Sequence, residues 1–181
     1  MPRINPVELA TADTGVQATL GAVKAKIGMV PNLFATFAQA PAVLNGNLAF
    51  ADALTKGVLT AAQREIVSLA VAQYNSCHYC LSAHTLLGKG AGLSPAAIRA
   101  ARQGKGESAI DNAIATLALR IVETRGQVSD ADLSEARLAG LDDARIVEIV
   151  GNVAHNVLTN FMNNVAQTKI DFPVVDVAIA A

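Results

Sequence analysis

Two cysteines and a histidine are spaced in a way that could support redox chemistry. Cys77, Cys80 and His84 are separated by three and four positions, so on a helix they would share one face. If that helix begins near Cys77, both thiols lie in its first turn, where free backbone N–H groups and the helix dipole stabilise a thiolate. Glu65, twelve residues before Cys77, could return towards the thiols across a helical hairpin.

These four side chains suit catalysis by an activated thiol. An imidazole can accept the thiol proton and return it to a leaving group, and a carboxylate can orient that imidazole. A second cysteine lets a sulfenic acid resolve as a disulfide before further oxidation. Because a C-x-x-C pair in a chain without a secretory signal favours redox or metal chemistry, we interpret the pair as redox-active.

Two other interpretations of the cysteines stay open. The thiols could be small buried hydrophobic groups, as free cysteines often are. Alternatively, Cys77, Cys80 and His84 could hold zinc, with Glu65 or water as the fourth ligand. No second Cys/His pair completes such a site in this sequence. We therefore expect neither a resident metal nor a cofactor.

The segment that carries these residues is predicted to form two helices joined by a short break. Thr60 and Gln63 match a capping box, which predicts a helix that begins here and runs to about Asn75. Asn75 and Ser76 interrupt the pattern, and residues 77–89 are predicted to form the next helix, closed by glycines. This hairpin would bring Glu65 back towards the thiols.

Helical signals also cover most of the remaining chain. Further helices are expected over about 13–27, 32–39, 41–56, 94–103, 109–124, 129–140 and 142–168. Only the apolar tail, 174–181, leaves room for a strand. We predict an all-α fold in a single domain, 1–181, with an N-terminal helical extension (1–50), a core with the Cys-x-x-Cys pair (51–168) and a C-terminal tail (169–181).

The last long helix is predicted to carry two stripes. One is polar, with Asn152, Asn156, Asn160 and either Asn163 or Asn164 at near-fourfold spacing. We favour a polar seam, hydrogen-bonded between helices or solvated, over a ligand site. The other stripe is apolar and is expected in the core or an interface: Ile149, Val153, Val157 and Phe161.

Composition and charge exclude several classes of protein. The 181 residues are 52% hydrophobic and 16% charged, which is enough apolar surface for a packed core and argues against disorder. The net charge of −1 provides no positive field for holding a phosphate backbone, so we expect no nucleic-acid partner.

Residues 66–88 carry no formal charge, but polar side chains interrupt them, so we expect no membrane span. The start lacks an apolar signal region, and we expect a cytoplasmic protein.

The spacing Glu-x11-Cys-x2-Cys-x3-His, formed by Glu65, Cys77, Cys80 and His84, resembles the motif of AhpD-like alkylhydroperoxidases in the carboxymuconolactone decarboxylase superfamily. The surrounding sequence is similar to a peroxidase-related subgroup, and the resemblance covers roughly residues 15–173. The segments that carry this further similarity are 29–32, 81–85, 88–93 and 170–173.

The resemblance implies an AhpD-like helical-hairpin bundle that assembles as a homo-oligomer, a trimer or a hexamer. It implies reduction of hydrogen peroxide or organic hydroperoxides through a Cys-x-x-Cys disulfide cycle. By position, Cys80 matches the peroxide-attacking cysteine, Cys77 the resolving cysteine, and Glu65 and His84 the proton relay. The partners it implies are a peroxide substrate and an external dithiol reductant of the lipoyl or thioredoxin kind.

One position departs from the family pattern. The best-known alkylhydroperoxidases carry a further relay histidine directly before the second cysteine, where this sequence has Tyr79. We expect Tyr79 to pack beside the thiols, where its hydroxyl could form a hydrogen bond, and His78 to lie at the surface or in a subunit interface. Two alternative functions stay open: lactone decarboxylation by the same fold, and a non-enzymatic oligomeric redox sensor or binding protein.

Overall fold

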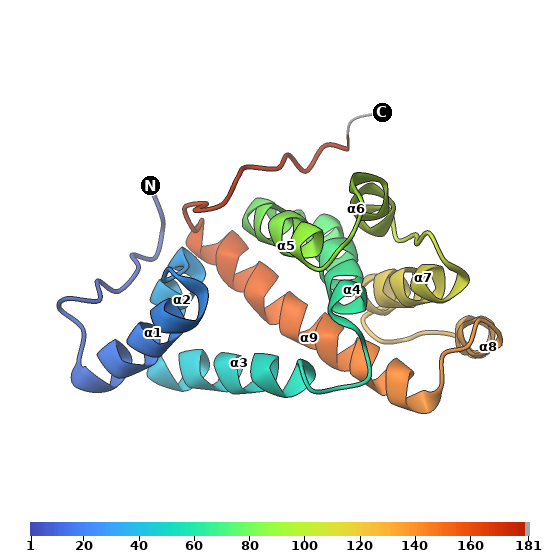
Figure 1. Ribbon diagram of the computed structural model, residues 1–181, viewed down its shortest axis with the longest axis horizontal. Helices are drawn as coiled ribbons and strands as arrows, with labels where there is room; N and C mark the ends of the chain where they lie inside the picture. Colours follow the sequence, from blue (N-terminus) through green and yellow to red (C-terminus); the bar gives the residue numbers. More distant parts are fainter. Residues whose placement is uncertain (180–181) are drawn as a thin grey trace.

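Helices account for all the regular secondary structure of residues 1–179, the part of the chain that this computed structural model describes (Figure 1). Within that range there is no strand, so the predicted all-α class is confirmed. The predicted helix boundaries are confirmed to within a few residues. The helices are α1 (Thr14–Ile27), α2 (Asn32–Phe37), α3 (Pro41–Leu54), α4 (Ala61–Tyr74), α5 (His78–Gly90), α6 (Pro95–Arg102), α7 (Ala109–Thr124), α8 (Asp130–Leu138) and α9 (Asp143–Ala166).

Side-chain caps explain why most of these helices begin where the sequence predicts. At the start of α4, the Thr60 hydroxyl accepts the Gln63 backbone N–H at 3.2 Å, and the Gln63 side chain accepts the Thr60 N–H at 3.1 Å. Such a cap satisfies N–H groups that have no partner inside the helix and typically contributes about 1 kcal/mol. The same role is played at other helices by Asp13, Ser94, Ser108, Ser129 and Asp142.

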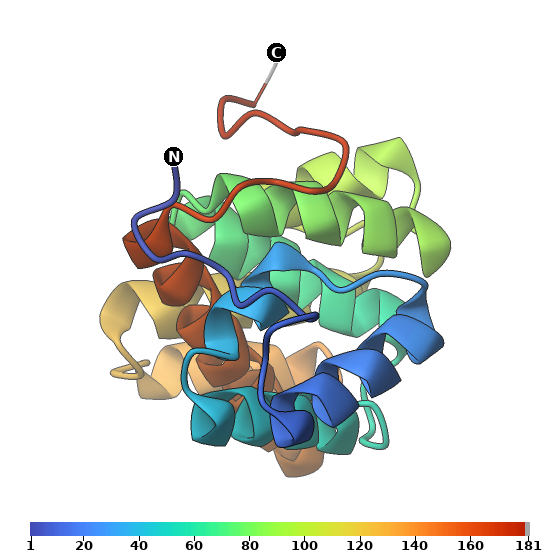
Figure 2. The same cartoon turned by 90° about the vertical axis from the view of Figure 1, so that its left-hand side faces the viewer.

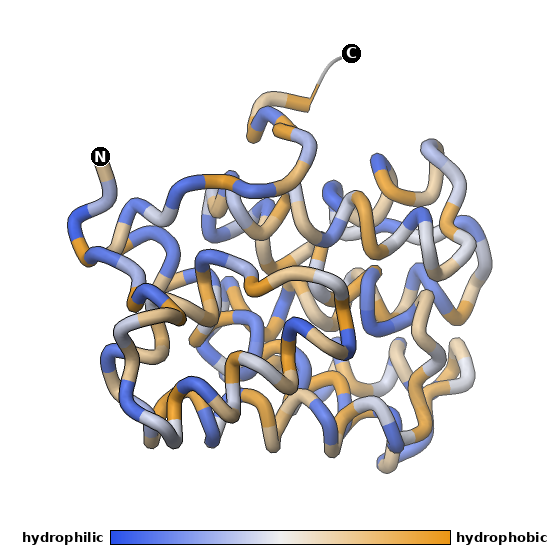
Figure 3. The backbone as a smooth tube through the Cα atoms, turned by 60° about the vertical axis from the view of Figure 1, so that its left-hand side comes forward, coloured by the Kyte–Doolittle hydropathy of each residue, from blue (hydrophilic) through white to orange (hydrophobic). Residues whose placement is uncertain are grey.

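The hydrophobic core is built around α4, which packs against α5, α6, α7 and α9. Its Val67, Leu69 and Val71 are fully buried, as are Ile114 on α7 and Ile149 on α9. Apolar and polar positions are mixed along the chain, as Figure 3 shows, and the outer helices bury one side and expose the other, whereas residues 66–72 of α4 are all buried. Of the predicted apolar stripe on α9, Ile149 and Val153 lie in this core, whereas Phe161 is exposed.

The two ends of the chain pack against this core. Helices α1 to α3 lie along one side of α9, and the tail crosses over α5 (Figures 1 and 2). The tail backbone is held by side chains of the core: Ser82 accepts Val175 N–H at 3.0 Å, and Gln73 donates to the Val177 carbonyl at 2.9 Å. The possible strand is therefore wrong for residues 174–179, because these backbone groups bind side chains rather than a neighbouring strand. Positions 180 and 181 lie outside the described residues.

The uncharged stretch 66–88 is divided between α4 and α5 by the turn at Asn75 and Ser76. Across residues 1–179, no helix has the length and apolar character needed to cross a membrane. The division of the chain at residues 50 and 168 stays a prediction, and α3 spans the first of these boundaries.

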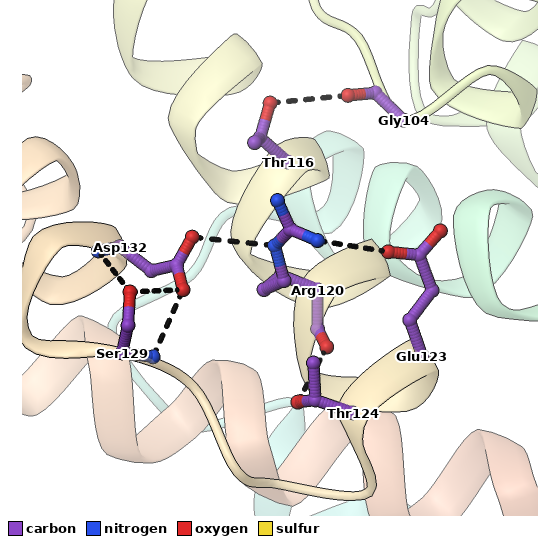
Figure 4. Close-up of polar contacts among 7 residues, drawn as sticks. All are labelled: Gly104, Thr116, Arg120, Glu123, Thr124, Ser129 and Asp132. Carbon is purple, nitrogen blue, oxygen red and sulfur yellow. Dashed lines mark hydrogen bonds and ion pairs between the residues drawn. The ribbon is translucent and has the colours of Figure 1, made fainter.

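The α7–α8 corner is held by surface polar contacts (Figure 4). Arg120 donates to Asp132 at 3.2 Å and forms an ion pair with Glu123 at 3.6 Å. Asp132 also accepts the hydroxyl and the backbone N–H of Ser129, which forms the cap of α8. These residues are exposed and far from the cysteines in sequence. Substitutions at them therefore serve as controls for substitutions at other sites.

Glu148 joins α9 to the loop before α4. Its carboxylate accepts the backbone N–H groups of Val58 and Leu59, the latter at 3.0 Å. A Cβ atom at Gly57 would overlap this carboxylate, so glycine at this position allows the close approach of Glu148 to the loop. Glu148 thereby fixes the segment that leads into the Thr60 cap and into α4.

We predict that Glu148→Gln lowers the free energy of unfolding by about 2 kcal/mol, because a charged acceptor is lost and an amide N–H₂ then faces a backbone donor. Urea unfolding followed by circular dichroism measures this change. Glu123→Gln, which removes only a surface ion pair, should change stability by less than about 0.5 kcal/mol. Equal effects of the two substitutions would contradict this role of Glu148.

Candidate active site

The turn between α4 and α5 determines where the cysteines lie. Ser76 adopts a left-handed conformation (φ 51°), and the following Cys77 N–H bonds back to the Ala72 carbonyl at 2.9 Å. Two asparagines of α9 hold this turn: Asn160 accepts the Asn75 amide at 3.0 Å, and Asn164 donates to the Asn75 carbonyl at 2.8 Å. Left-handed backbone is unfavourable for residues other than glycine, so these bonds stabilise a turn that Ser76 disfavours.

Both cysteines lie at the start of α5, as predicted. Cys77 is the N-cap residue of α5, and its sulfur accepts the Cys80 N–H at 3.2 Å. The two sulfurs form a disulfide with an S–S distance of 2.11 Å. Cys77 is 0% and Cys80 is 2% exposed. The redox-active pair of the sequence prediction is thus placed at a helix N-terminus, where the backbone stabilises negative charge on sulfur.

Glu65 and His84 form a direct pair between α4 and α5. His84 Nδ1 lies 2.8 Å from Glu65 Oε2, and the side chains are 20% and 17% exposed. A carboxylate only accepts hydrogen bonds, so Nδ1 carries the proton and Nε2 of the neutral ring is left free to act as a base. Because His84 follows Cys80 by one helical turn on α5, the hairpin brings all four predicted site residues into one region.

Asn163 is a site residue that the sequence analysis missed. Its Nδ2 donates to Cys80 Sγ at 3.3 Å, its side chain is only 4% exposed, and its Oδ1 has no hydrogen-bond partner within residues 1–179. The near-fourfold asparagine spacing is the available signal in the sequence, and that pattern favours a polar seam. The hydrogen-bonded seam is confirmed for other members, such as Asn156, which donates to Ser68 at 3.1 Å.

Tyr79, which precedes Cys80 in the sequence, is buried, and its hydroxyl bonds to the N-terminal segment. It accepts the Leu33 N–H at 3.2 Å, and its ring meets Phe172 edge-on at 5.5 Å. Burial raises the pKa of Tyr79 above its ordinary value, so the phenol stays neutral. The sequence leaves open a hydrogen bond between this hydroxyl and the thiols. In the structure the hydroxyl instead bonds to Leu33 of the N-terminal segment. His78 is exposed, as expected for a surface residue.

Two short motifs singled out in the sequence meet over Tyr79. Asp171 accepts the Asn32 N–H at 2.6 Å, and the Asn32 side chain donates to the Lys169 carbonyl at 2.9 Å. Segments 29–32 and 170–173 are thereby joined although they are far apart in sequence, and Phe172 of the second segment packs against the buried Tyr79 ring. For metal binding, residues 1–179 contain no group of three or more His, Cys, Asp or Glu side chains arranged to hold an ion.

Residues 41–124, which contain α4, α5 and all four predicted site residues, match the carboxymuconolactone decarboxylase family. The matched segment makes up a little under half of the chain. No curated protein sequence matches the chain significantly. The expected relation to this superfamily is confirmed, and the matched segment includes the whole Glu65-to-His84 hairpin.

Similarity to solved structures covers most of the chain. A peroxidase-related protein from Ralstonia eutropha JMP134, described as an alkylhydroperoxidase AhpD core, has a TM-score of 0.85 at 27% identity, covering 94% of this chain and 92% of its own. A peroxidase-related protein from Silicibacter sp. TM1040 has a TM-score of 0.78 at 22% identity, covering 92% and 91%. The debrominase Bmp8 in complex with 2,3,4-tribromopyrrole has a TM-score of 0.77 at 13% identity, and the match covers 93% of this chain and 91% of the debrominase chain. The fold is AhpD-like.

His155 of α9 is mostly buried between α9 and α3. Its Nε2 lies 3.0 Å from Asn47 Oδ1 of α3, and its ring meets Phe50 edge-on at 5.8 Å. Burial, with a smaller contribution from the charge of His84, lowers the pKa of His155 to about 4. The ring is therefore neutral near pH 7, with Nε2 donating its proton to the Asn47 oxygen.

We predict that His155 makes the protein sensitive to acid. Its pKa is about 6.5 when unfolded and about 4 when folded, so the unfolded chain takes up the proton first as pH falls. The free energy of unfolding should then decrease by up to about 3 kcal/mol between pH 6.5 and pH 4. Urea unfolding at several pH values measures this decrease. In His155→Gln the decrease should be smaller, and an unchanged pH dependence would contradict the assignment.

Proposed function

We propose that this protein is a thiol-dependent peroxidase that reduces hydrogen peroxide or organic hydroperoxides through a Cys77–Cys80 disulfide cycle. The observation that carries the proposal is the placement of this disulfide at the start of α5, with the Glu65–His84 pair one turn further along the same hairpin. A helix N-terminus, a nearby base and a carboxylate that orients it are the groups that activate a thiol as a nucleophile. The AhpD-like fold is consistent with this activity.

In the proposed cycle, His84 Nε2 accepts the proton of the reduced Cys80 thiol, while Glu65 holds Nδ1 and stabilises the resulting positive charge. The thiolate attacks the terminal oxygen of the hydroperoxide, and the O–O bond breaks. The departing alkoxide takes the proton from His84 and leaves as an alcohol, or as water when hydrogen peroxide is the substrate. Cys80 is left as a sulfenic acid.

Cys77 then completes the oxidative half of the cycle. Its thiol attacks the Cys80 sulfur, the S–S bond forms, and water leaves. Reduction of the disulfide then needs two electrons and two protons from an external dithiol. A lipoyl- or thioredoxin-like donor has suitable chemistry for this step. We place this cycle in the cytoplasm, where such dithiols are kept reduced.

We also propose that the chain works as a homo-oligomer, a trimer or a hexamer. In support, α9 exposes apolar side chains along one face of the helix, and such a face favours burial against another surface. Phe161, at 54% exposure, lies in this row and was expected in the core or an interface. The exposed row is Val147, Val150, Leu158, Phe161 and Val165.

Two other functions give different results in a cysteine test. Lactone decarboxylation, which the family name also covers, would not depend on Cys77 or Cys80. A redox sensor would change its oligomeric state or partner binding with the disulfide, but would turn over peroxide negligibly. The buried disulfide beside a paired carboxylate and imidazole favours the peroxidase.

We predict that Cys80→Ser lowers peroxide turnover with a dithiol reductant by at least about a thousandfold, because the attacking sulfur is lost. Cys77→Ser should still react once with peroxide, but should stop as the Cys80 sulfenic acid. Dimedone labelling followed by mass spectrometry detects this product. Wild-type turnover in Cys80→Ser, or carbon dioxide release from a lactone by both variants, would contradict the peroxidase assignment.

We predict that Glu65→Gln lowers kcat by about 10- to 100-fold, because the amide keeps the hydrogen bond to His84 but cannot stabilise the imidazolium. The pH dependence of kcat should shift to lower pH for the same reason. Steady-state assays across the pH range measure both effects. Glu135→Gln, an exposed position on α8, should behave as the wild type, and an equal loss in both variants would exclude a specific role for Glu65.

A further inference from the structure

A polar pocket lies between the first turn of α5 and the C-terminal end of α9. Its volume is about 220 Å³, and it is lined by His78 and Tyr79 and by side chains from segment 163–170. Asn163 belongs both to this lining and to the contacts of Cys80, since its Nδ2 lies 3.3 Å from Sγ. The pocket therefore ends one side chain away from the attacking sulfur.

Two buried polar atoms of the pocket have no partner. Asn163 Oδ1 and Thr168 Oγ1 both belong to lining residues, and neither forms a hydrogen bond anywhere in residues 1–179. The two residues are linked, because Thr168 N–H bonds to the Asn163 carbonyl at 3.2 Å. Since more than about 90% of buried polar groups are normally satisfied, these two atoms need partners, which water or a polar ligand in the pocket can supply.

The backbone of α5 adds positive potential to the pocket. His78 and Tyr79 are the first two residues of this helix, and within the described chain their N–H groups have no acceptor. No carboxylate is among the residues that line the pocket. An oxygen atom that gains negative charge in this position is stabilised, as in an oxyanion site.

We propose that this pocket is the substrate site and that it takes small polar hydroperoxides, with Asn163 and Thr168 as the residues that bind them. The inference rests on the proposed function, because it assigns the binding site of that reaction. Asn163 donates from Nδ2 to the Cys80 sulfur and accepts the hydroperoxide O–H at Oδ1. One amide thus places the thiolate beside the oxygen that it attacks.

Thr168 acts on the other oxygen of the same substrate. As the thiolate attacks, the S–O bond forms and the O–O bond breaks, and the leaving oxygen carries the electron pair. The Thr168 hydroxyl and the free N–H groups of α5 stabilise this alkoxide until His84 supplies the proton taken from Cys80. The products are the Cys80 sulfenic acid and an alcohol or water, so atoms and electrons balance.

The size and polarity of the pocket limit the substrate. Sites for drug-sized ligands usually occupy about 300–1,000 Å³ and are largely apolar. A cavity of about 220 Å³ with amide and hydroxyl walls suits hydrogen peroxide or a hydroperoxide with a short polar substituent. A fatty-acid hydroperoxide would leave its chain outside and should react more slowly.

Stopped-flow oxidation of the reduced full-length protein tests this assignment. Thr168→Val is nearly isosteric and removes a hydroxyl that has no partner, so it should fold normally. It should slow oxidation by hydrogen peroxide about tenfold and leave alkylation by iodoacetamide unchanged, because the hydroxyl contacts the leaving oxygen and not the sulfur. Thr124→Val, the same substitution on α7 (Figure 4), should change neither rate. Wild type should react faster with hydrogen peroxide than with a fatty-acid hydroperoxide.

The outcomes separate this inference from the proposed function. If the wild-type thiols are oxidised by hydrogen peroxide but Thr168→Val reacts equally fast, the pocket is not the substrate site and the peroxidase proposal stands. A faster reaction with the fatty-acid hydroperoxide would overturn the assignment in the same way. If the wild type does not react with either hydroperoxide, the proposed function fails and the substrate site fails with it.

Discussion

The arrangement of the active site depends on one constraint, the turn at Asn75 and Ser76 that α9 holds against the core. Asn160 accepts a hydrogen bond from the side-chain amide of Asn75, and Asn164 donates to the Asn75 backbone carbonyl. Ser76 takes a left-handed conformation that it would otherwise avoid. The chain reverses here and places Cys77 at the cap of α5. The cysteines, the free N–H groups of the first turn and the return of α5 towards Glu65 all follow from this reversal.

Two kinds of electrostatic stabilisation act on two different groups, the Cys80 sulfur and the His84 ring. The N-terminus of α5 and the Asn163 amide favour negative charge on Cys80, while the Glu65 carboxylate favours positive charge on His84. Proton transfer from thiol to imidazole is supported at both ends. The N-terminal and C-terminal segments close over Tyr79 on the side of the pocket, which keeps the disulfide away from bulk water.

Most of the fold and four site residues could be predicted because their signals are local. The Thr60–Gln63 cap, the glycines after helices and the Cys77–His84 spacing lie within a few residues of one another. The contacts that were missed join distant parts of the chain: Asn163 and Cys80 are 83 residues apart, and Leu33 and Tyr79 are 46 apart. No local pattern shows which asparagine of a stripe faces a sulfur, because that depends on the angle at which α9 crosses the hairpin.

The central claim is that Cys77 and Cys80 form one redox couple in which Cys80 reacts with peroxide. Its most direct test is to add one equivalent of hydrogen peroxide to the reduced protein and count thiols, with intact mass spectrometry to identify the product. The account predicts that both thiols disappear together and that the chain loses two hydrogen atoms as the Cys77–Cys80 disulfide forms. Two unreactive thiols, or a Cys80 that gains oxygen while Cys77 stays free, would contradict it.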